Sequence, residues 1–445
     1  MSYARKPRTE RETALVERAN RLIPTGLRST SIRNELMFVV ERALGARLWD
    51  ASGNEYVDYL LGSGPMVLGH AHPAVVSAVR ERLAGGTTYL ILSEPPLELA
   101  QRIVELVPCA EQVLFQCSGT DATGYAVRIA RAATGRTKVL KFEGAYHGMG
   151  EWSLMSNQWT HELADYPRAV PNSDGIPASV RGLTLIAPWN DLDAAVRIIE
   201  ENHDDLACVI VEPLQRTFPP RPGFLAGLRD VTRALDIPFV FDEVVTGFRL
   251  ALGGAQERYG VVPDLCALGK SISGGHPIGV LCGAERYMRF ANPLRRFAGE
   301  PYVMASGTFS ANPISATAGL ACLAELEKPG VYERIQATGQ RLMEGLRAAF
   351  DEVAIPVQVT GEPSCFEAWF TDQPVYDHRS SLAADVFKRM RFTELLLEHG
   401  VVKAHEKFFV SAAHGEGEIE HTLWAFRAAA RALAADDEDT PCECW

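Results

Sequence analysis

The sequence has few lysines, no block of basic residues, no long apolar run and no regular cysteine spacing. Only eight of its 44 Lys and Arg residues are lysine, and 56 Asp and Glu residues give a formal net charge of −12. An acidic chain without a basic patch is a poor partner for nucleic acid, so we expect none. No run is long enough to span a bilayer, and the first twenty residues lack the apolar core of a signal peptide. We therefore expect no membrane association.

The nine cysteines are odd in number, and most of them lie inside apolar runs. This pattern is typical of reduced core thiols and predicts a cytoplasmic protein without a disulfide framework. Cys442 and Cys444 are separated by a single residue in an acidic tail. Because that spacing is a poor zinc motif, we expect no metal site.

Short β-rich runs alternate with helical stretches between about residues 74 and 310. This alternation predicts an α/β domain with a mostly parallel sheet, and in such sheets ligands bind beyond the carboxyl ends of the strands. The seven predicted strands are Gln112–Gln116, Lys138–Phe142, Leu183–Ala187, Ala207–Val211, Pro238–Phe241, Leu265–Leu268 and Val280–Cys282.

Other patterns flank this domain. Residues 10–22 predict an amphipathic helix, Val39 to Tyr59 predicts a hairpin with its turn at Asp50 to Asn54, and Glu416 to Ala435 predicts a closing helix. We therefore expect three parts: an N-terminal segment (1–73), a large domain (74–312) and a smaller C-terminal domain (313–445).

Lys270 ends an apolar run and opens a turn of small residues. A lysine at the mouth of a buried strand is partly desolvated, which lowers its pKa and favours the neutral amine that condenses with a carbonyl. This chemistry points to a Schiff base with pyridoxal phosphate. The alternative is a lysine that only extends from a strand end toward solvent.

Two further strands end in carboxylates: Glu212 follows one, and Asp242 and Glu243 follow the next. A buried carboxylate bonded to a pyridine nitrogen keeps that nitrogen protonated, and Asp242 is our candidate for this role. The alternative is that Asp242 or Glu243 caps the next segment.

Two predicted strands that come earlier in the chain also end in groups that could bind the phosphate and the ring of such a cofactor. Ser118-Gly119-Thr120 opens a helix, where free N–H groups and the helix dipole favour a phosphate. Ser118 with Asp121 also matches a capping box, and capping alone is the alternative. Tyr146 could stack on a flat ring and His147 could orient it by a hydrogen bond, with simple packing as the alternative.

Together and in this order, the motifs resemble the class III, fold-type I pyridoxal-phosphate aminotransferases, and most the glutamate-1-semialdehyde aminomutase-like branch. The resemblance runs from about Ile23 to Leu433. It rests on the segments Leu48–Asp50, Gly64–Pro73, Ser118–Thr123, Phe142–Gly148, Phe241–Arg249, Leu268–Lys270, Ser306–Phe309 and Phe409–His414.

The resemblance implies a role for each matching residue and a smaller α+β domain built from both terminal segments. Lys270 would hold the cofactor and move the substrate proton, and Asp242 would bind the pyridine nitrogen. Val244 and Tyr146 would pack on the two ring faces, and Glu212 would lie near the ring hydroxyl and the substrate. The phosphate would be bound by Ser118, Gly119, Thr120 and, from the neighbouring subunit, Thr308, which implies a homodimer with shared active sites.

Several positions depart from the family. Asp121 stands where the family usually has Glu, and Arg216 occupies a turn that usually contains glycine. The spacing near the N-terminus and the lid at Asn157–Ser179 match the aminomutase poorly. The substrate-binding candidates are Arg28, Ser29, Arg33, Arg216, Trp152 and Glu406. For each arginine a salt bridge is the alternative, and for Trp152 it is lid packing.

Three interpretations follow. The first is an aminotransferase that moves an amino group from an amino-acid or amine donor to a keto-acid or aldehyde acceptor. The second is an isomerase, either an aminomutase or an amino-acid racemase or epimerase, that uses the same residues. The third is a non-catalytic binding scaffold, which would need neither Lys270 nor Asp242. The identities of the donor and the acceptor stay open.

Overall fold

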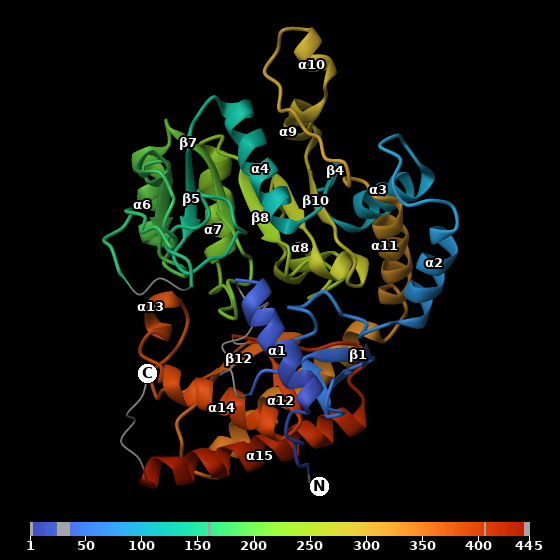
Figure 1. Ribbon diagram of the computed structural model, residues 1–445. Coiled ribbons are helices and arrows are strands. Elements are labelled where there is room, and N and C mark those ends of the chain that lie inside the picture. Colours follow the sequence, from blue (N-terminus) through green and yellow to red (C-terminus); the bar gives the residue numbers. More distant parts are fainter. Residues whose placement is uncertain (1–2, 25–35, 159–161, 405, 440–445) are drawn as a thin grey trace. The chain divides into compact units, whose positions relative to one another are not determined.

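The computed structural model describes residues 3–24, 36–158, 162–404 and 406–439. The chain divides into two compact units (Figure 1). The large unit holds Pro73–Lys328 with Tyr376–His378, and the small unit holds Met1–His72, Pro329–Val375 and Arg379–Trp445. The two terminal segments of the chain therefore belong to one unit.

The large unit is built on a seven-stranded sheet, as predicted. Its strand order is β4-β10-β9-β8-β7-β5-β6, and every neighbouring pair is parallel except those made by β10. Residues 269–278 join β9 to β10, which is too short for the crossover that a parallel pair needs. The strands are β4 (Gln112–Gln116), β5 (Lys138–Phe142), β6 (Thr184–Ala187), β7 (Leu206–Val211), β8 (Phe239–Glu243), β9 (Leu265–Leu268) and β10 (Gly279–Gly283).

Helices cover this sheet, so its inner strands are buried along their whole length, which accounts for their continuous apolar runs. Helix α4 packs its Ala126, Ile129 and Ala130 against the strands in one hydrophobic cluster. The helices are α2 (Pro73–Leu83), α3 (Glu94–Leu106), α4 (Gly119–Thr134), α5 (Ala178–Arg181), α6 (Leu192–Asn202), α7 (Phe224–Ala234), α8 (Gly254–Tyr259), η2 (Lys270–Ser273), α9 (Glu285–Met288), η3 (Arg289–Ala291), α10 (Leu294–Phe297) and α11 (Pro313–Leu326).

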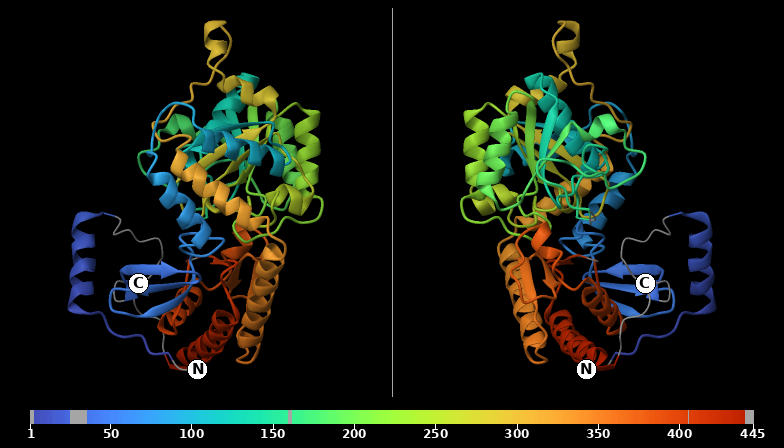
Figure 2. Two further views of the ribbon diagram at one scale, coloured as in Figure 1. Left: turned by 90° about the vertical axis from the view of Figure 1, so that its right-hand side faces the viewer. Right: turned by 90° about the vertical axis from the view of Figure 1, so that its left-hand side faces the viewer.

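Helix α11 corrects the predicted boundary after residue 312. It belongs to the large unit and lies beside α2 and α3 (Figure 2). A Cβ atom on Gly319 would lie 3.1 Å from Leu99 and 3.2 Å from the carbonyl oxygen of Ile272. This close packing of small residues ties α11 to the large unit, and the chain leaves that unit only after Lys328.

The small unit combines two sheets with long helices. One sheet has the order β1-β2-β3-β13, in which the parallel pair of β3 and β13 joins the two terminal segments, and the other has the order β11-β12-β14. Its elements are α1 (Glu10–Leu22), β1 (Val40–Leu44), β2 (Arg47–Asp50), β3 (Glu55–Tyr59), α12 (Val331–Asp351), β11 (Gln358–Glu362), β12 (Cys365–Trp369), α14 (Val386–Glu398), β13 (Val401–Lys403), β14 (Phe408–Phe409) and α15 (Glu416–Asp439), while α13 (His378–Ser381) begins in the large unit.

The predicted hairpin from Val39 to Tyr59 is a three-stranded meander. Gly45, at a φ of 58°, turns the chain between β1 and β2 within the run that the sequence presented as one strand. Glycine adopts this left-handed conformation without steric cost, and so it allows the tight turn.

Cysteines among the described residues are all free, and three of them converge in the core of the large unit. The sulfur atoms of Cys109, Cys266 and Cys282 lie within 4.8 Å of one another. Among the helices of the described ranges, none has both the length and the apolar character that crossing a membrane requires.

Candidate active site

Three strand ends of the large unit bring charged side chains to one edge of the sheet. Glu212 follows β7, Asp242 lies near the end of β8, and Lys270 follows β9 after one glycine. Because β7, β8 and β9 are parallel neighbours, their carboxyl ends meet at the same edge. The sheet thus places side chains that are 58 residues apart in sequence in one region.

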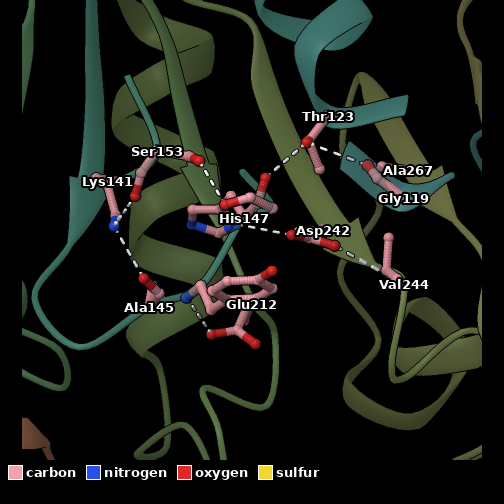
Figure 3. Close-up of polar contacts among 12 residues, drawn as sticks. Gly119, Thr123, Lys141, Ala145, His147, Ser153, Glu212, Asp242, Val244 and Ala267 are labelled. Carbon is pink, nitrogen blue, oxygen red and sulfur yellow. Dashed lines mark hydrogen bonds and ion pairs between the residues drawn. The ribbon is translucent and has the colours of Figure 1, made fainter. Parts of the chain in front are cut away.

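Asp242 is buried and hydrogen-bonded through both carboxylate oxygens (Figure 3). The Nδ1 atom of His147 donates to Oδ2 at 2.7 Å, and the backbone N–H of Val244 donates to Oδ1 at 3.1 Å. A carboxylate only accepts, so the proton of the imidazole lies on Nδ1. Each carboxylate oxygen can accept a further bond, which leaves Asp242 able to take an N–H from a ligand.

His147 is fixed from several sides. The hydroxyl of Thr123 on α4 donates to the carbonyl oxygen of His147 at 2.8 Å, and the ring of Trp152 stacks on the imidazole at 6.1 Å between centroids. Trp152 also packs against the hydrophobic cluster beneath α4. The structure therefore favours the packing interpretation of Trp152 over a contact with substrate.

Glu212 connects the segment that carries Tyr146 to the turn that carries Arg216. Its Oε2 accepts the backbone N–H of Tyr146 at 3.0 Å, and its Oε1 lies 3.9 Å from Nη1 of Arg216. Arg216 has a φ of 58°, an unusual conformation for a residue with a side chain. Burial raises the pKa of the Tyr146 phenol, and the nearby Arg216 charge opposes this shift.

The Lys270 amine lies among the charged groups of the site. Burial lowers its pKa, the Asp242 carboxylate opposes that shift, and the Arg216 guanidinium adds to it. The residue has a φ of 45° and follows Gly269 in extended backbone. Strained backbone of this kind persists where surrounding structure imposes it, and it is concentrated at functional sites.

The segment Ser118-Gly119-Thr120 forms the N-terminus of α4, as predicted. Ser118 is the N-cap, and its hydroxyl oxygen accepts the backbone N–H of Asp121 at 3.2 Å. A Cβ atom on Gly119 would lie 2.8 Å from the side chain of Val244, so this helix end lies directly against the loop after Asp242. The first-turn N–H groups of a 16-residue helix thus face the same region as Asp242.

Glu243 has a structural role, and here the capping alternative holds. Its carboxylate accepts bonds from the hydroxyl of Thr246 and from the backbone N–H of Ala255 at the start of α8. Burial raises the pKa of Glu243 to about 7, and these hydrogen bonds oppose the shift. Of the two consecutive carboxylates, only Asp242 contacts His147.

The other candidates are distributed elsewhere. Thr308 lies on an exposed turn of the large unit, and Glu406 belongs to the small unit. Arg28, Ser29 and Arg33 lie outside the described residues.

Two residues of this site were missed at the level of sequence: Thr123, which holds the His147 carbonyl, and Lys141 on β5. The amine of Lys141 is fully buried and donates to three backbone carbonyls of the segment that carries Tyr146 and His147. Burial lowers the pKa of Lys141 to about 7, and the Glu212 carboxylate opposes the shift. The scarcity of lysine, combined with its position within an apolar strand, was the available signal.

Residues 30–413 match the family described as Aminotransferase class-III. The glutamate-1-semialdehyde 2,1-aminomutase of Desulfitobacterium hafniense is 41% identical over 425 residues, which cover 93% of this chain and 96% of that protein. The chain belongs to the class III aminotransferase family. The crystal structure of an omega-transaminase from Sphaerobacter thermophilus is similar to that of this class III protein, with a TM-score of 0.90 and 34% sequence identity. The similarity covers 95% of this chain and 97% of the omega-transaminase.

Members of this family depend on pyridoxal phosphate. One similar structure, a transaminase with PLP bound, is 29% identical with a TM-score of 0.89 and covers 98% of this chain and 100% of that one. The cofactor of this chain is therefore pyridoxal phosphate.

Proposed function

We propose that this protein is an aminotransferase that moves an amino group from an amino-acid or amine donor to a keto-acid or aldehyde acceptor. The Lys270 amine and the buried Asp242 carboxylate, at the ends of neighbouring strands, support the cofactor chemistry that this function needs. The observation that carries the choice of an aminotransferase is the similarity to the omega-transaminase, which supports transfer between two separate substrates.

The residues at the site fit pyridoxal phosphate. The N-terminus of α4 offers free N–H groups of Ser118, Gly119 and Thr120 to the phosphate. Asp242 has acceptor capacity for the protonated pyridine nitrogen, and the buried Nε2 of His147 has no hydrogen-bond partner among the described residues. Val244 and Tyr146 would cover the two faces of the ring.

When bound, the cofactor supplies an electron sink that stabilises negative charge at the substrate carbon. Lys270 would hold the cofactor covalently and, once displaced by the substrate amine, act as general base and acid at that carbon. Its lowered pKa makes the neutral amine available for this proton transfer. Asp242 would keep the pyridine nitrogen protonated, and His147 would keep Asp242 in place.

Arg216 is our candidate for the substrate carboxylate. Its guanidinium pairs loosely with Glu212, at 3.9 Å, and its charge influences both Lys270 and Tyr146. A guanidinium fork can accept a carboxylate in bidentate geometry. An amino donor with a carboxylate would then bind with its amine toward Lys270.

A second candidate function is an aminomutase, in which one substrate is both donor and acceptor. The observation that favours it is the 41% identity to a glutamate-1-semialdehyde 2,1-aminomutase over nearly the whole chain. The two functions need the same cofactor residues and differ in whether a carbonyl product leaves the site.

The proposal includes a homodimer. Leu90, Ile91 and Leu92, in the loop between α2 and α3, each expose three quarters or more of their surface, and Phe309 next to Thr308 is also exposed. Exposed apolar groups of this kind are typical of interaction surfaces. In a dimer with shared sites, Thr308 would bind the phosphate in the partner's site.

An absorbance titration tests the function. Purified protein with pyridoxal phosphate is mixed with a panel of α-amino acids, β-amino acids and amines. Conversion of the cofactor band to the pyridoxamine form, with an equivalent of carbonyl product released, supports transamination and identifies the donor. Isomerisation of glutamate-1-semialdehyde without any released carbonyl compound supports the aminomutase. A protein that shows no cofactor band overturns both.

A further inference from the structure

The segment that carries Tyr146 and His147 has no regular secondary structure, yet both residues need fixed positions in the proposed site. This segment, residues 144–156, follows β5, and its two ends meet where the Gly144 N–H donates to the Ser156 carbonyl oxygen at 2.8 Å. Bonds from His147 to Asp242 and from Tyr146 to Glu212 link the segment to the site, and the hydroxyls of Thr123 and Thr120 bond its backbone at His147 and Met149. Ordering an irregular loop costs conformational entropy, so further contacts must hold the segment in place.

Lys141 makes three of the bonds that hold the segment, alongside single bonds such as that from the Ser156 N–H to the Val170 carbonyl oxygen. Its Nζ donates to the carbonyl oxygens of Ala145 at 2.8 Å and Ser153 at 3.0 Å (Figure 3). It also donates to that of Met155 at 2.7 Å, so all three N–H bonds of the ammonium are used. The side chain is fully buried within β5. One cation thereby joins both ends of the segment and leaves Tyr146 and His147 in the span between its acceptors.

The environment of Lys141 extends this connection to the site. The carboxylate of Glu212 acts on the Lys141 charge and also accepts the N–H of Tyr146. Ser153, whose carbonyl binds Lys141, donates its hydroxyl to the carbonyl oxygen of Gly148, next to His147. Removal of the Lys141 amine would leave three buried carbonyls without a donor, a change that the segment can relieve only by moving.

We propose that Lys141 is a positioning residue for the cofactor site: its buried ammonium clamps residues 144–156 and so fixes His147 against Asp242 and Tyr146 over the ring. The proposal rests on the proposed roles of His147 and Asp242, but its structural part, the clamping of the segment, is measurable without them.

The test compares Lys141→Met with a matched control, Lys403→Met. Lys403 is likewise fully buried and donates to the Glu367 carboxylate at 2.8 Å and to the Ala404 carbonyl, but it lies on β13 in the small unit. Hydrogen exchange of residues 144–156 is measured by mass spectrometry in the full-length protein with and without pyridoxal phosphate, together with the dissociation constant of the cofactor.

We expect Lys141→Met to raise exchange in this segment and weaken cofactor binding by roughly tenfold or more each, since hydrogen bonds to a charged group are lost. Lys403→Met should change neither the exchange of residues 144–156 nor the dissociation constant of the cofactor by more than about twofold, because the effects of distant, independent sites do not influence one another. Unchanged exchange at 144–156 in Lys141→Met, or an equal change in the control, overturns the proposal.

Two further outcomes are informative. If Lys141→Met does not fold, Lys141→Gln, which keeps two N–H donors, is expected to fold and to show an intermediate effect on exchange. A Gln variant that also fails to fold shows that Lys141 serves the fold as a whole and overturns a specific positioning role. Increased exchange with unchanged cofactor affinity retains the clamp but refutes its link to the site, and so separates this inference from the proposed function.

Discussion

Replacement of Asp242 by asparagine is the most direct test of how the site holds its cofactor. The carboxylate is 5% exposed and accepts from both His147 Nδ1 and the backbone N–H of Val244. Asp242→Asn keeps the shape but removes the charge opposite the pyridine nitrogen. It also leaves one oxygen where there were two, so one of the two N–H groups loses its acceptor and faces the amide NH₂ instead.

The lost charge opposite the pyridine nitrogen sets the effect on cofactor binding. A hydrogen bond between charged groups contributes about 1.5–3 kcal/mol, so we expect cofactor binding to weaken by roughly 10- to 150-fold, with a similar or larger loss of the rate of the amino-transfer half-reaction. The N–H group left without an acceptor lowers the stability of the protein by about 1–3 kcal/mol whether or not the cofactor is bound.

The assay is titration of cofactor-free protein with pyridoxal phosphate, followed by absorbance, with Asp264→Asn as the control. Asp264 is also buried and accepts from Arg229, Arg286 and the backbone N–H of Phe239, so its loss should lower stability without changing cofactor affinity. A dissociation constant for pyridoxal phosphate within about threefold of the wild-type value in Asp242→Asn would refute the assigned role of Asp242, since threefold corresponds to far less than about 1.4 kcal/mol. An equal loss of cofactor affinity in Asp264→Asn would refute it as well.

Four further predictions concern the Lys270 amine, the substrate and the phosphate cradle. Lys270→Ala should lose the absorbance band of covalently held cofactor and all turnover, and retained turnover would assign the chemistry to another group. Because burial lowers the Lys270 pKa, the rate of covalent cofactor attachment should rise with pH and level off at a pH below the ordinary lysine pKa of about 10.4. A rate that still rises tenfold per pH unit at about pH 10 would contradict the lowered pKa. Arg216→Gln should lower kcat/KM for a donor with a carboxylate by about 10- to 100-fold but leave a matched amine nearly unchanged, since the charge-assisted contact with the carboxylate is removed. The control is Arg221→Gln, in the same loop as Arg216, where the guanidinium lies over the Tyr376 ring, and equal losses for both donors would remove Arg216 from substrate binding. Gly279→Ala should strongly destabilise the large unit, because its Cβ would lie 1.9 Å from the Ser118 carbonyl oxygen, and an unchanged melting temperature would show that β10 and the α4 N-terminus move apart without cost.

Much of the large unit could be predicted from local sequence patterns. All seven strands occur where short β-rich runs indicated them, and those that are buried along their whole length are mostly apolar because both of their faces are covered. The N-cap Ser118 and the positions of Glu212, Asp242 and Lys270 just at or beyond strand ends are equally local features, since each depends on a few neighbouring residues. The resemblance to the class III family, which needs only collinear motifs, was available for the same reason.

Other features depended on contacts between segments. The alternation of side chains along β8 places Asp242 and Glu243 on opposite faces, but only the packed structure shows that one faces His147 and the other caps α8. Trp152, a candidate substrate contact, stacks on the His147 ring and packs against the hydrophobic cluster that includes α4, and only the folded chain shows these neighbours. Helix α11 follows the predicted domain boundary, but its Gly319 packs against Leu99 of α3 and Ile272 of η2 in the large unit.

Runs of consecutive residues were enough to locate the strands, to within a few residues at their ends, and the charged groups near those ends. Which of these groups meet, and what holds them, depended on contacts between segments far apart in the chain. Lys141 illustrates the difference: along the chain it is a lysine in an apolar strand, and only the folded chain brings three carbonyl oxygens around its amine. A buried cation is stable only with such partners, and their positions are set by the path of the whole segment.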